Sequence, residues 1–261
     1  MDISLQHKTA LICGSTQGIG FASAIELAKL GATCIIMARN ETALKEALQK
    51  LDTSFQQQHH YLIADFNKPE EVKAIIEKFT ANNTVHILIN NSGGPQGGPI
   101  TNATEDEFIN TFNRHLICNH ILTKAVIEGM KAANYGRVIN IISTSVKIPL
   151  PNLGVSNTVR GAVASWAKTM ANELGQFNIT VNSVLPGATN TQRLQTIIEN
   201  NAGKKNTSIE TIEEEMKKEI PARRFAEASE IAAVVAFLAS PAAAYVNGVS
   251  IPVDGGRTGT I

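Results

Sequence analysis

The chain has 261 residues, with 23 basic and 23 acidic side chains, and its share of hydrophobic residues is ordinary for a globular protein. This length fits one large α/β domain, and the balanced charge provides no electrostatic footprint for nucleic acid or an anionic membrane. No apolar run approaches the ~18 residues of a membrane span, and the N-terminus lacks a signal-peptide pattern, so we expect a cytoplasmic protein. We expect buried thiols at Cys13, Cys34 and Cys118, rather than a disulfide or a metal site.

Short apolar runs alternate with longer helical patterns along the chain. The runs predict buried strands at 9–13, 33–37, 86–90, 137–142, 179–185 and 248–253, and a further strand before Asp65. Helices are predicted at 18–30, 40–50, 69–82, 104–131, 154–175 and 229–239. This alternation predicts an α/β fold in which a parallel sheet is covered by helices on both faces. We find no interdomain linker, so residues 1–261 are predicted to form a single domain.

The segment 190–222 differs from the rest of the chain. It is polar, contains "NNAGKKNTS", and continues into "IETIEEEMKKEI". We expect an excursion over the ligand-binding edge of the sheet that contains one short amphipathic helix. Its cluster of charges is expected to be a solvated face rather than a binding patch.

Glycines mark the turn between the first strand and the first helix. In "CGSTQGIGFASAIELAKLG", Gly14, Gly18 and Gly20 permit a tight turn and let backbone N–H groups approach a pyrophosphate. A purely structural turn can also use glycines, but the position between a strand and a helix favours dinucleotide binding. The spacing G-x-x-x-G-x-G differs from the common fingerprint G-x-G-x-x-G.

That spacing is the one found in the short-chain dehydrogenase/reductase family, which the chain resembles over nearly its whole length. The matching segments are "NNSGG" at 90–94 (Ser92 stands where the family has alanine), "GRVINIIS" at 136–143, "NITVNSVLPGATNT" at 178–191 and "EIAAVVAFLASPAAAYVNGVSIPVDGG" at 230–256. In overall sequence the chain is similar to 3-oxoacyl-(acyl carrier protein) reductases. The resemblance implies a single-domain Rossmann fold with a seven-stranded sheet, one cofactor crevice, and hydride transfer between a nicotinamide and a carbonyl or alcohol.

The end of the second strand bears on which cofactor is used. In "IIMARN", Ala38 stands where NAD-type members of the family carry aspartate, and Arg39 follows. A guanidinium can pair with a 2′-phosphate, so we expect NADP(H) rather than NAD(H); a surface arginine without a ligand is the alternative. Asp65 matches the residue that bonds adenine, although it could also cap a helix, and Thr191 matches a contact to the nicotinamide carboxamide. The resemblance implies further cofactor contacts from Gly14, Ser15, Gly18, Ile19, Gly20, Asn91, Gly93, Pro186, Gly187 and Thr189.

The resemblance also places the catalytic positions. The family uses a tyrosine that passes the proton, a lysine that lowers the pKa of this tyrosine, a serine that binds the substrate oxygen, and an asparagine that supports a water chain. By position the serine is Ser143, whereas the tyrosine, lysine and asparagine positions hold Ser156, Arg160 and His115. An aliphatic hydroxyl is a weaker acid than a phenol of pKa ~10, and arginine cannot shuttle a proton. Arg160 keeps the positive charge and is expected to anchor the cofactor.

His115 is the candidate replacement for the missing acid. An unperturbed pKa of ~6.5 suits general acid–base work, although a histidine packed in a helix contact is the simpler interpretation. His120 is expected to point elsewhere, and no metal-ligand spacing is present. No other tyrosine fills the gap: Tyr61 belongs to the third strand and Tyr135 to a loop, and Tyr245 is expected to pack.

Two hypotheses remain open at this point. The chain is either an NADP(H)-dependent oxidoreductase with a rearranged proton relay, or a catalytically silent nucleotide-binding protein such as a sensor or a partner subunit. A methyltransferase is disfavoured by "PGATNT" and "VDGG". The expected substrate is a small or medium carbonyl compound or an acyl thioester, in a pocket near Ser143, Ser145 and 149–153. A homo-dimer or homo-tetramer is expected from apolar positions on more than one face of the long helices: Ile121, Val126, Val163, Trp166 and Met170.

Overall fold

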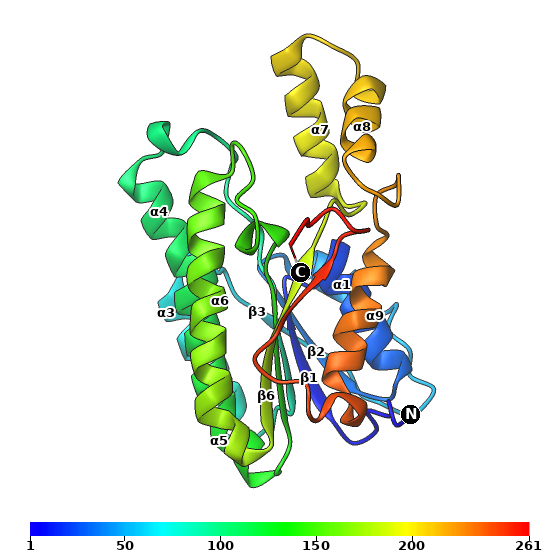
Figure 1. Cartoon of the computed structure of the whole chain (residues 1–261). Coiled ribbons are helices and arrows are strands. Elements are labelled where there is room, and N and C mark those ends of the chain that lie inside the picture. The colour runs from blue at the N-terminus through cyan, green and yellow to red at the C-terminus, as the bar shows by residue number, and fades with distance from the viewer. Residues whose placement is uncertain (261) are drawn as a thin grey trace.

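The computed structural model describes residues 1–260 and contains one seven-stranded sheet in the order β3-β2-β1-β4-β5-β6-β7 (Figure 1). All six pairings are parallel. The strands are β1 (Thr9–Cys13), β2 (Thr33–Ala38), β3 (His60–Ile63), β4 (Ile87–Asn90), β5 (Gly136–Ile141), β6 (Ile179–Pro186) and β7 (Ser250–Val253). The central strands are apolar throughout because helices bury both faces of the sheet. The expected α/β Rossmann fold is thereby confirmed.

The helices divide between the two faces of the sheet. They are α1 (Gly18–Lys29), α2 (Glu41–Leu48), α3 (Pro69–Thr80), α4 (Glu105–Phe112), α5 (Cys118–Ala132), α6 (Gly154–Leu174), α7 (Gln192–Lys205), α8 (Ile209–Lys218) and α9 (Ala228–Ala239). Apolar side chains of α1, α2 and α9 share one core cluster, and those of α3, α5 and α6 share the other. Figure 1 shows these two layers on opposite sides of the sheet.

The strand order creates one switch point in the sheet. The chain builds β1, β2 and β3 outward in one direction, and then returns to place β4 on the other side of β1. Loops leaving the carboxyl ends of β1 and β4 therefore diverge, and ligands of open α/β sheets bind in the crevice between such loops. The glycine turn after β1 and the segment after β4 both lie at this point.

The predicted helix 104–131 is interrupted. A π-helical turn, Asn113–Ile117, joins α4 to α5 and contains His115. One extra residue per turn locally changes which side chains face the sheet, and such turns are frequent at functional sites. A count based on 3.6 residues per turn could not predict this change of phase.

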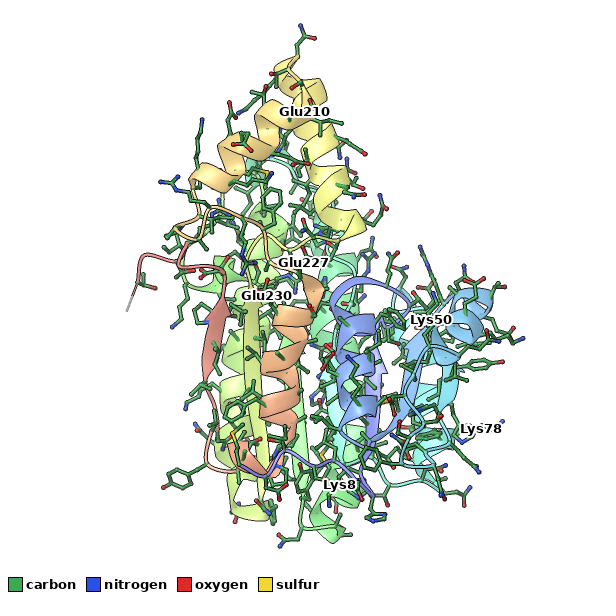
Figure 2. The ribbon with its side chains drawn as sticks, turned by 90° about the vertical axis from the view of Figure 1, so that its right-hand side faces the viewer. Lys8, Lys50, Lys78, Glu210, Glu227 and Glu230 are labelled. Atoms are coloured by element: carbon green, nitrogen blue, oxygen red, sulfur yellow. The ribbon has the colours of Figure 1, made fainter. Side chains whose placement is uncertain are left out.

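The segment 190–222 holds two helices, α7 and α8, where one short helix was expected. Leu194, Ile198 and Ala202 recur every four residues on α7 and form a small apolar cluster with residues of α8 and its surroundings. Most of the polar run "NNAGKK" lies on the exposed face of α7, so the run shows few of the apolar positions that mark a helix. Both helices project beyond the carboxyl edge of the sheet (Figures 1 and 2).

All three cysteines are free and buried, as expected. Burial raises the pKa of the Cys13 and Cys34 thiols far above the usual value, and it raises the pKa of Cys118 to about 12. These thiols therefore act as small apolar side chains. No helix within residues 1–260 is long and apolar enough to cross a membrane.

Candidate functional site

The glycine turn after β1 is closed too tightly for side chains. Gly14 and Gly18 both have φ of +57°, and a Cβ added at Gly20 would lie 2.3 Å from the carbonyl oxygen of Gly14. Asn91 steadies the turn, because its Nδ2 donates to the carbonyl oxygens of Gly14 (3.1 Å) and Cys13 (3.2 Å). The first turn of α1 has neither an acidic residue nor a capping side chain, so its N–H groups remain available to an anion.

Two other predicted cofactor residues of this turn have structural roles. The hydroxyl of Ser15 is fully buried and accepts a hydrogen bond from the N–H of Met37 at 3.0 Å, which ties the turn to β2. Ile19 is partly buried and packs against the apolar core on the α1 side. Any contact of Ser15 with a nucleotide would therefore involve its backbone.

The segment after β6 meets the glycine turn. A Cβ added at Gly18 would lie 3.2 Å from Cγ2 of Thr191, so these residues, 173 positions apart in the sequence, are neighbours. Thr191 caps α7 by accepting from the N–H of Leu194 at 3.4 Å. Gly187, which follows Pro186 at the end of β6, has no room for a side chain, because a Cβ would lie 2.7 Å from Asp254.

Further predicted contacts surround the same crevice. Thr189 is buried, and its hydroxyl donates to the carbonyl oxygen of Gly187 at 3.1 Å. Arg39 is exposed at the end of β2 and, within residues 1–260, pairs with no acidic side chain. Asp65 forms a local turn, because its Oδ1 accepts from the backbone N–H (3.0 Å) and from Nδ2 (2.8 Å) of Asn67. It does not cap α3, which has Lys68 at its N-cap.

Ser143 and Arg160 lie at the carboxyl end of β5, and Ser156 is one helical turn from Arg160 on α6. Ser143 follows this strand, and its Oγ accepts from the N–H of Ser145 at 3.1 Å. Ser156 and Arg160 are four residues apart on α6, so they share one face of the helix, and both are buried. Arg160 Nη1 donates to the carbonyl oxygen of Ile141 at 3.0 Å. Burial and the charge of Arg193 lower the pKa of Arg160 to about 10, so it is still a cation at neutral pH.

His115 is buried in the π turn with only 4 % of its surface exposed. Its Nδ1 lies 2.8 Å from Oγ of Ser92, and its Nε2 has no hydrogen-bond partner among residues 1–260. Burial, together with the charges of Arg160, Arg114 and Arg193, holds the pKa of His115 well below its usual range. The ring is therefore neutral at neutral pH, which corrects the expectation that it titrates near pH 6 to 7. His120 is exposed and packs edge-on against Trp166, away from this site.

None of the three tyrosines reaches this site. The hydroxyl of Tyr61 donates to Glu41 at 2.9 Å, and that of Tyr135 donates to the carbonyl oxygen of Ala239 at 2.5 Å. Tyr245 is fully exposed, which corrects the expectation that it packs within the chain. The hydroxyl groups that follow β5 in the chain are those of Ser143, Thr144 and Ser145.

Sequence reasoning missed two arginines beside His115. Arg114 Nη1 donates to the carbonyl oxygen of Gly93 at 3.3 Å, and Arg193, at the start of α7, donates to the carbonyl oxygens of Gly94 and Pro95. The sequence held a signal only for the neighbouring Ser92–His115 pair. Both positions depart from the family pattern, and in the structure the two residues are hydrogen-bond partners. Arg193 had no such signal, because its segment was not predicted to be helical.

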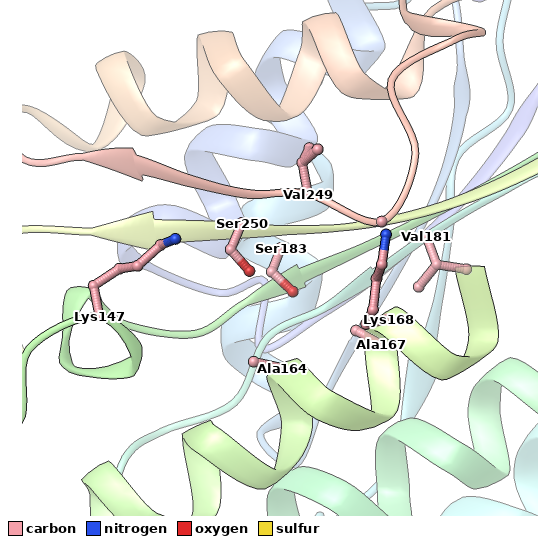
Figure 3. Close-up of a pocket in the computed structure, with 9 residues that line it drawn as sticks. Lys147, Ala164, Ala167, Lys168, Val181, Ser183, Val249 and Ser250 are labelled. Atoms are coloured by element: carbon pink, nitrogen blue, oxygen red, sulfur yellow. The ribbon is translucent and has the colours of Figure 1, made fainter. Parts of the chain in front are cut away.

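A cavity of about 420 Å³ lies elsewhere, between α6, β6 and β7. In Figure 3, Lys147 and Lys168 flank Ser183 and Ser250. None of the predicted catalytic or cofactor-binding residues lines it. It is therefore separate from the crevice at the switch point of the sheet.

Comparisons with known proteins agree with this geometry. Residues 14–258 match the family model described as enoyl-(acyl carrier protein) reductase. The 3-oxoacyl-[acyl-carrier-protein] reductase FabG of Pseudomonas aeruginosa is 34% identical over 257 residues, which cover 97% of this chain and 98% of that protein.

Solved structures share the whole architecture. YwfH, described as an NADPH-dependent reductase involved in bacilysin biosynthesis, has a TM-score of 0.92 and 29% identity, covering 97% of this chain and 99% of that one. L-sorbose reductase from Gluconobacter frateurii, complexed with NADPH and L-sorbose, has a TM-score of 0.93 and 29% identity over 100% of both chains. Seven parallel strands, the glycine turn at their switch point and these matches lead to one conclusion: the chain belongs to the short-chain dehydrogenase/reductase family.

Proposed function

We propose that this chain is an NADP(H)-dependent oxidoreductase that interconverts a carbonyl and an alcohol, with Ser156 and Arg160 in place of the family's tyrosine and lysine. The observation that carries the proposal is the bond from Arg160 to the carbonyl oxygen of Ile141. It fixes a cation at the carboxyl end of β5, beside Ser143 and one helical turn from Ser156. This arrangement supports a site in which a substrate oxygen would meet a positive charge and hydroxyl groups.

The residues around the crevice fit a dinucleotide phosphate. The turn 14–20 excludes side chains, and the uncapped N-terminus of α1 suits a pyrophosphate. Arg39, which pairs with no acidic group among residues 1–260, suits the 2′-phosphate, and the names of the NADPH-dependent neighbours support that choice. Asp65 and Thr191 would hold the adenine and the carboxamide. When bound, the nicotinamide would supply or accept the hydride.

Chain residues would handle the oxygen and its proton. Ser143 and Ser156 would donate hydrogen bonds to the substrate oxygen, and the fixed charge of Arg160 would stabilise the negative charge that develops there. Arg160 does not release a proton in this range of pH. We propose that the neutral His115 ring, oriented by Ser92, takes up a proton from the solvent and passes it through Ser143 to the substrate oxygen.

The substrate would be a small or medium carbonyl compound. A 3-oxoacyl thioester is included because a FabG protein is among the relatives. The relatives named as reductases give no support to the catalytically silent alternative.

We also propose a homo-dimer or homo-tetramer. Val126, Val163 and Met170, expected as interface positions, are buried within the single chain and do not support an interface. The support comes instead from large exposed side chains, including Ile109 on α4 and Tyr245 before β7. Sedimentation of a monomer at micromolar concentration would contradict an oligomer.

The test of the proposed function measures binding and turnover together. NADPH and NADH binding is followed by nucleotide fluorescence, and carbonyl reduction is screened over ketones, oxo acids and acyl thioesters. The proposal expects tighter binding of NADPH and turnover of at least one class. Nucleotide binding with no turnover of any substrate class would instead establish the catalytically silent alternative.

A further inference from the structure

Three side chains from two elements hold the segment 92–95 after β4. They belong to His115 and Arg114, on the π turn, and to Arg193, on α7. The bonds join Ser92 Oγ to His115 Nδ1 (2.8 Å), Arg114 Nη1 to the oxygen of Gly93 (3.3 Å), and Arg193 Nη1 and Nη2 to the oxygens of Gly94 (3.1 Å) and Pro95 (2.9 Å). A Cβ added at Gly94 would lie 2.9 Å from Arg193 Nη2, so the guanidinium lies directly against the backbone.

These arginines bring positive charge without a counter-ion. Among the ion pairs formed by residues 1–260, none contains Arg114, Arg160 or Arg193. The carbonyl oxygens that they contact accept hydrogen bonds but carry no net charge. Arg160 is 9 % exposed and uses one of its five N–H donors, in the bond to Ile141. Unpaired charge is costly in the buried position of Arg160, and an anion would relieve it; Arg114 and Arg193, which are less buried, add to the positive potential.

His115 provides a second, independent observation. Its Nε2 is buried and has no partner, although buried polar atoms are normally hydrogen-bonded. Burial, and after it the charges of Arg160, Arg114 and Arg193, hold the pKa of the ring well below its usual range. A neutral ring also leaves the positive charge of the cluster available to a ligand.

The phosphates of the dinucleotide have other places to bind. The uncapped N-terminus of α1 would receive the pyrophosphate, and Arg39 at the end of β2 would receive the 2′-phosphate. The unpaired charge of Arg114, Arg160 and Arg193 therefore remains for the other ligand of the site. Arg193 starts α7, one of the two helices above the crevice, and is exposed to solvent, so an entering molecule can reach it.

We propose, building on the oxidoreductase function above, that the substrate is a small oxo acid whose carboxylate is bound by Arg193 beside the reacting carbonyl. A guanidinium can bind a carboxylate through two parallel hydrogen bonds, which fixes its orientation. In the reaction the oxo acid gains the hydride at carbon and one proton at oxygen, and becomes a hydroxy acid while NADPH becomes NADP⁺. Neutral ketones and esters lack the group that Arg193 binds.

The experiment compares acids with their esters in the full-length protein. Substrates are pyruvate against methyl pyruvate and acetoacetate against methyl acetoacetate, with an acetoacetyl thioester alongside, and NADPH oxidation gives kcat/KM. The variants are Arg193→Ala and, as a matched control, Lys204→Ala, which removes an exposed charge from the far end of the same helix. Quenching of bound NADPH fluorescence by each acid measures binding without turnover.

The proposal expects an acid to be preferred over its ester by tenfold or more. Arg193→Ala should lower kcat/KM for the acid by about 10- to 100-fold, as expected for a hydrogen bond to a charged group, and Lys204→Ala should leave it unchanged. Equal use of acids and esters, or an acid preference that survives Arg193→Ala, would overturn the carboxylate site while leaving the oxidoreductase intact. Binding of acids through Arg193 without any turnover would support the site and refute the oxidoreductase. If no acid binds and none is turned over, the carboxylate proposal is overturned.

Discussion

The buried, neutral His115 should make folding stability fall as the pH is lowered, and replacing it by asparagine should reduce this fall. The pKa of the histidine is about 6.5 in an unfolded chain, whereas in the folded chain it is well below that value because of burial and three nearby arginines. Below pH 6.5 the unfolded state therefore binds a proton at this histidine that the folded state does not bind. The stabilisation is fully present above pH 6.5 and is lost as the pH falls through that value.

The magnitude follows from the proton bound by the unfolded state. If the folded ring stays neutral, the loss between pH 7.5 and pH 5.5 is about 1.4 kcal/mol. This corresponds to roughly 3 to 6 °C in melting temperature for a chain of this size. His115→Asn removes the titrating ring but keeps an amide oxygen that can accept a hydrogen bond from Ser92.

Urea denaturation at pH 7.5, 6.5 and 5.5 measures the effect. The quantity of interest is the difference between parent and variant, because other groups titrate in both proteins; His86, for example, also has a lowered pKa through burial. His120→Asn is the matched control, since that ring is exposed. The reasoning fails if the parent and His115→Asn lose stability equally on acidification. It also fails if catalysis shows a titration between pH 6 and 7 that disappears in His115→Asn.

Three further changes test the cofactor site and the altered active site. Arg39→Ala should weaken NADPH binding more than NADH binding, by a few kcal/mol at most, and fluorescence titration that shows equal losses would contradict the assignment. Gly20→Ala should abolish binding of both nucleotides, because its Cβ would lie 2.3 Å from a backbone oxygen. The control Gly161→Ala should bind like the parent, because the added Cβ would meet nothing within 4 Å. Nucleotide binding retained by Gly20→Ala would disprove the tight turn. Ser156→Tyr combined with Arg160→Lys should increase the rate of ketone reduction, measured as NADPH oxidation, by on the order of 10²-fold if proton supply limits the parent. An unchanged or lower rate in a folded variant would show that proton supply does not limit the parent.

Local patterns in the sequence determined the layers of the fold. The run "TALIC" predicts a buried strand at 9–13, and the structure has β1 at those residues. The glycines that follow predict a turn that excludes side chains, and the contacts at Gly14 and Gly20 agree. Such features depend on residues close together in the chain, so composition, periodicity and turn chemistry are sufficient to find them.

Other features depended on what folding brings together. The polar residues of α7 gave no sign of a helix, because its apolar positions are few and pack against α8. Tyr245 was expected to pack, but no part of residues 1–260 covers it. A polar or an aromatic residue carries no local mark of which neighbours will cover it. Burial therefore had to be observed in the tertiary structure.

The protonation state of His115 was the least predictable feature from the sequence. Its ordinary pKa suggested a titrating acid, but the structure surrounds it with arginines from α6, α7 and its own turn. The Ser92 that orients it comes from the end of β4, 23 positions away. A pKa is set by burial and by the sum of nearby charges, and both arise only when distant segments meet. The sequence by itself therefore determined the fold and the crevice at its switch point, whereas only the tertiary structure decided the electrostatics around His115.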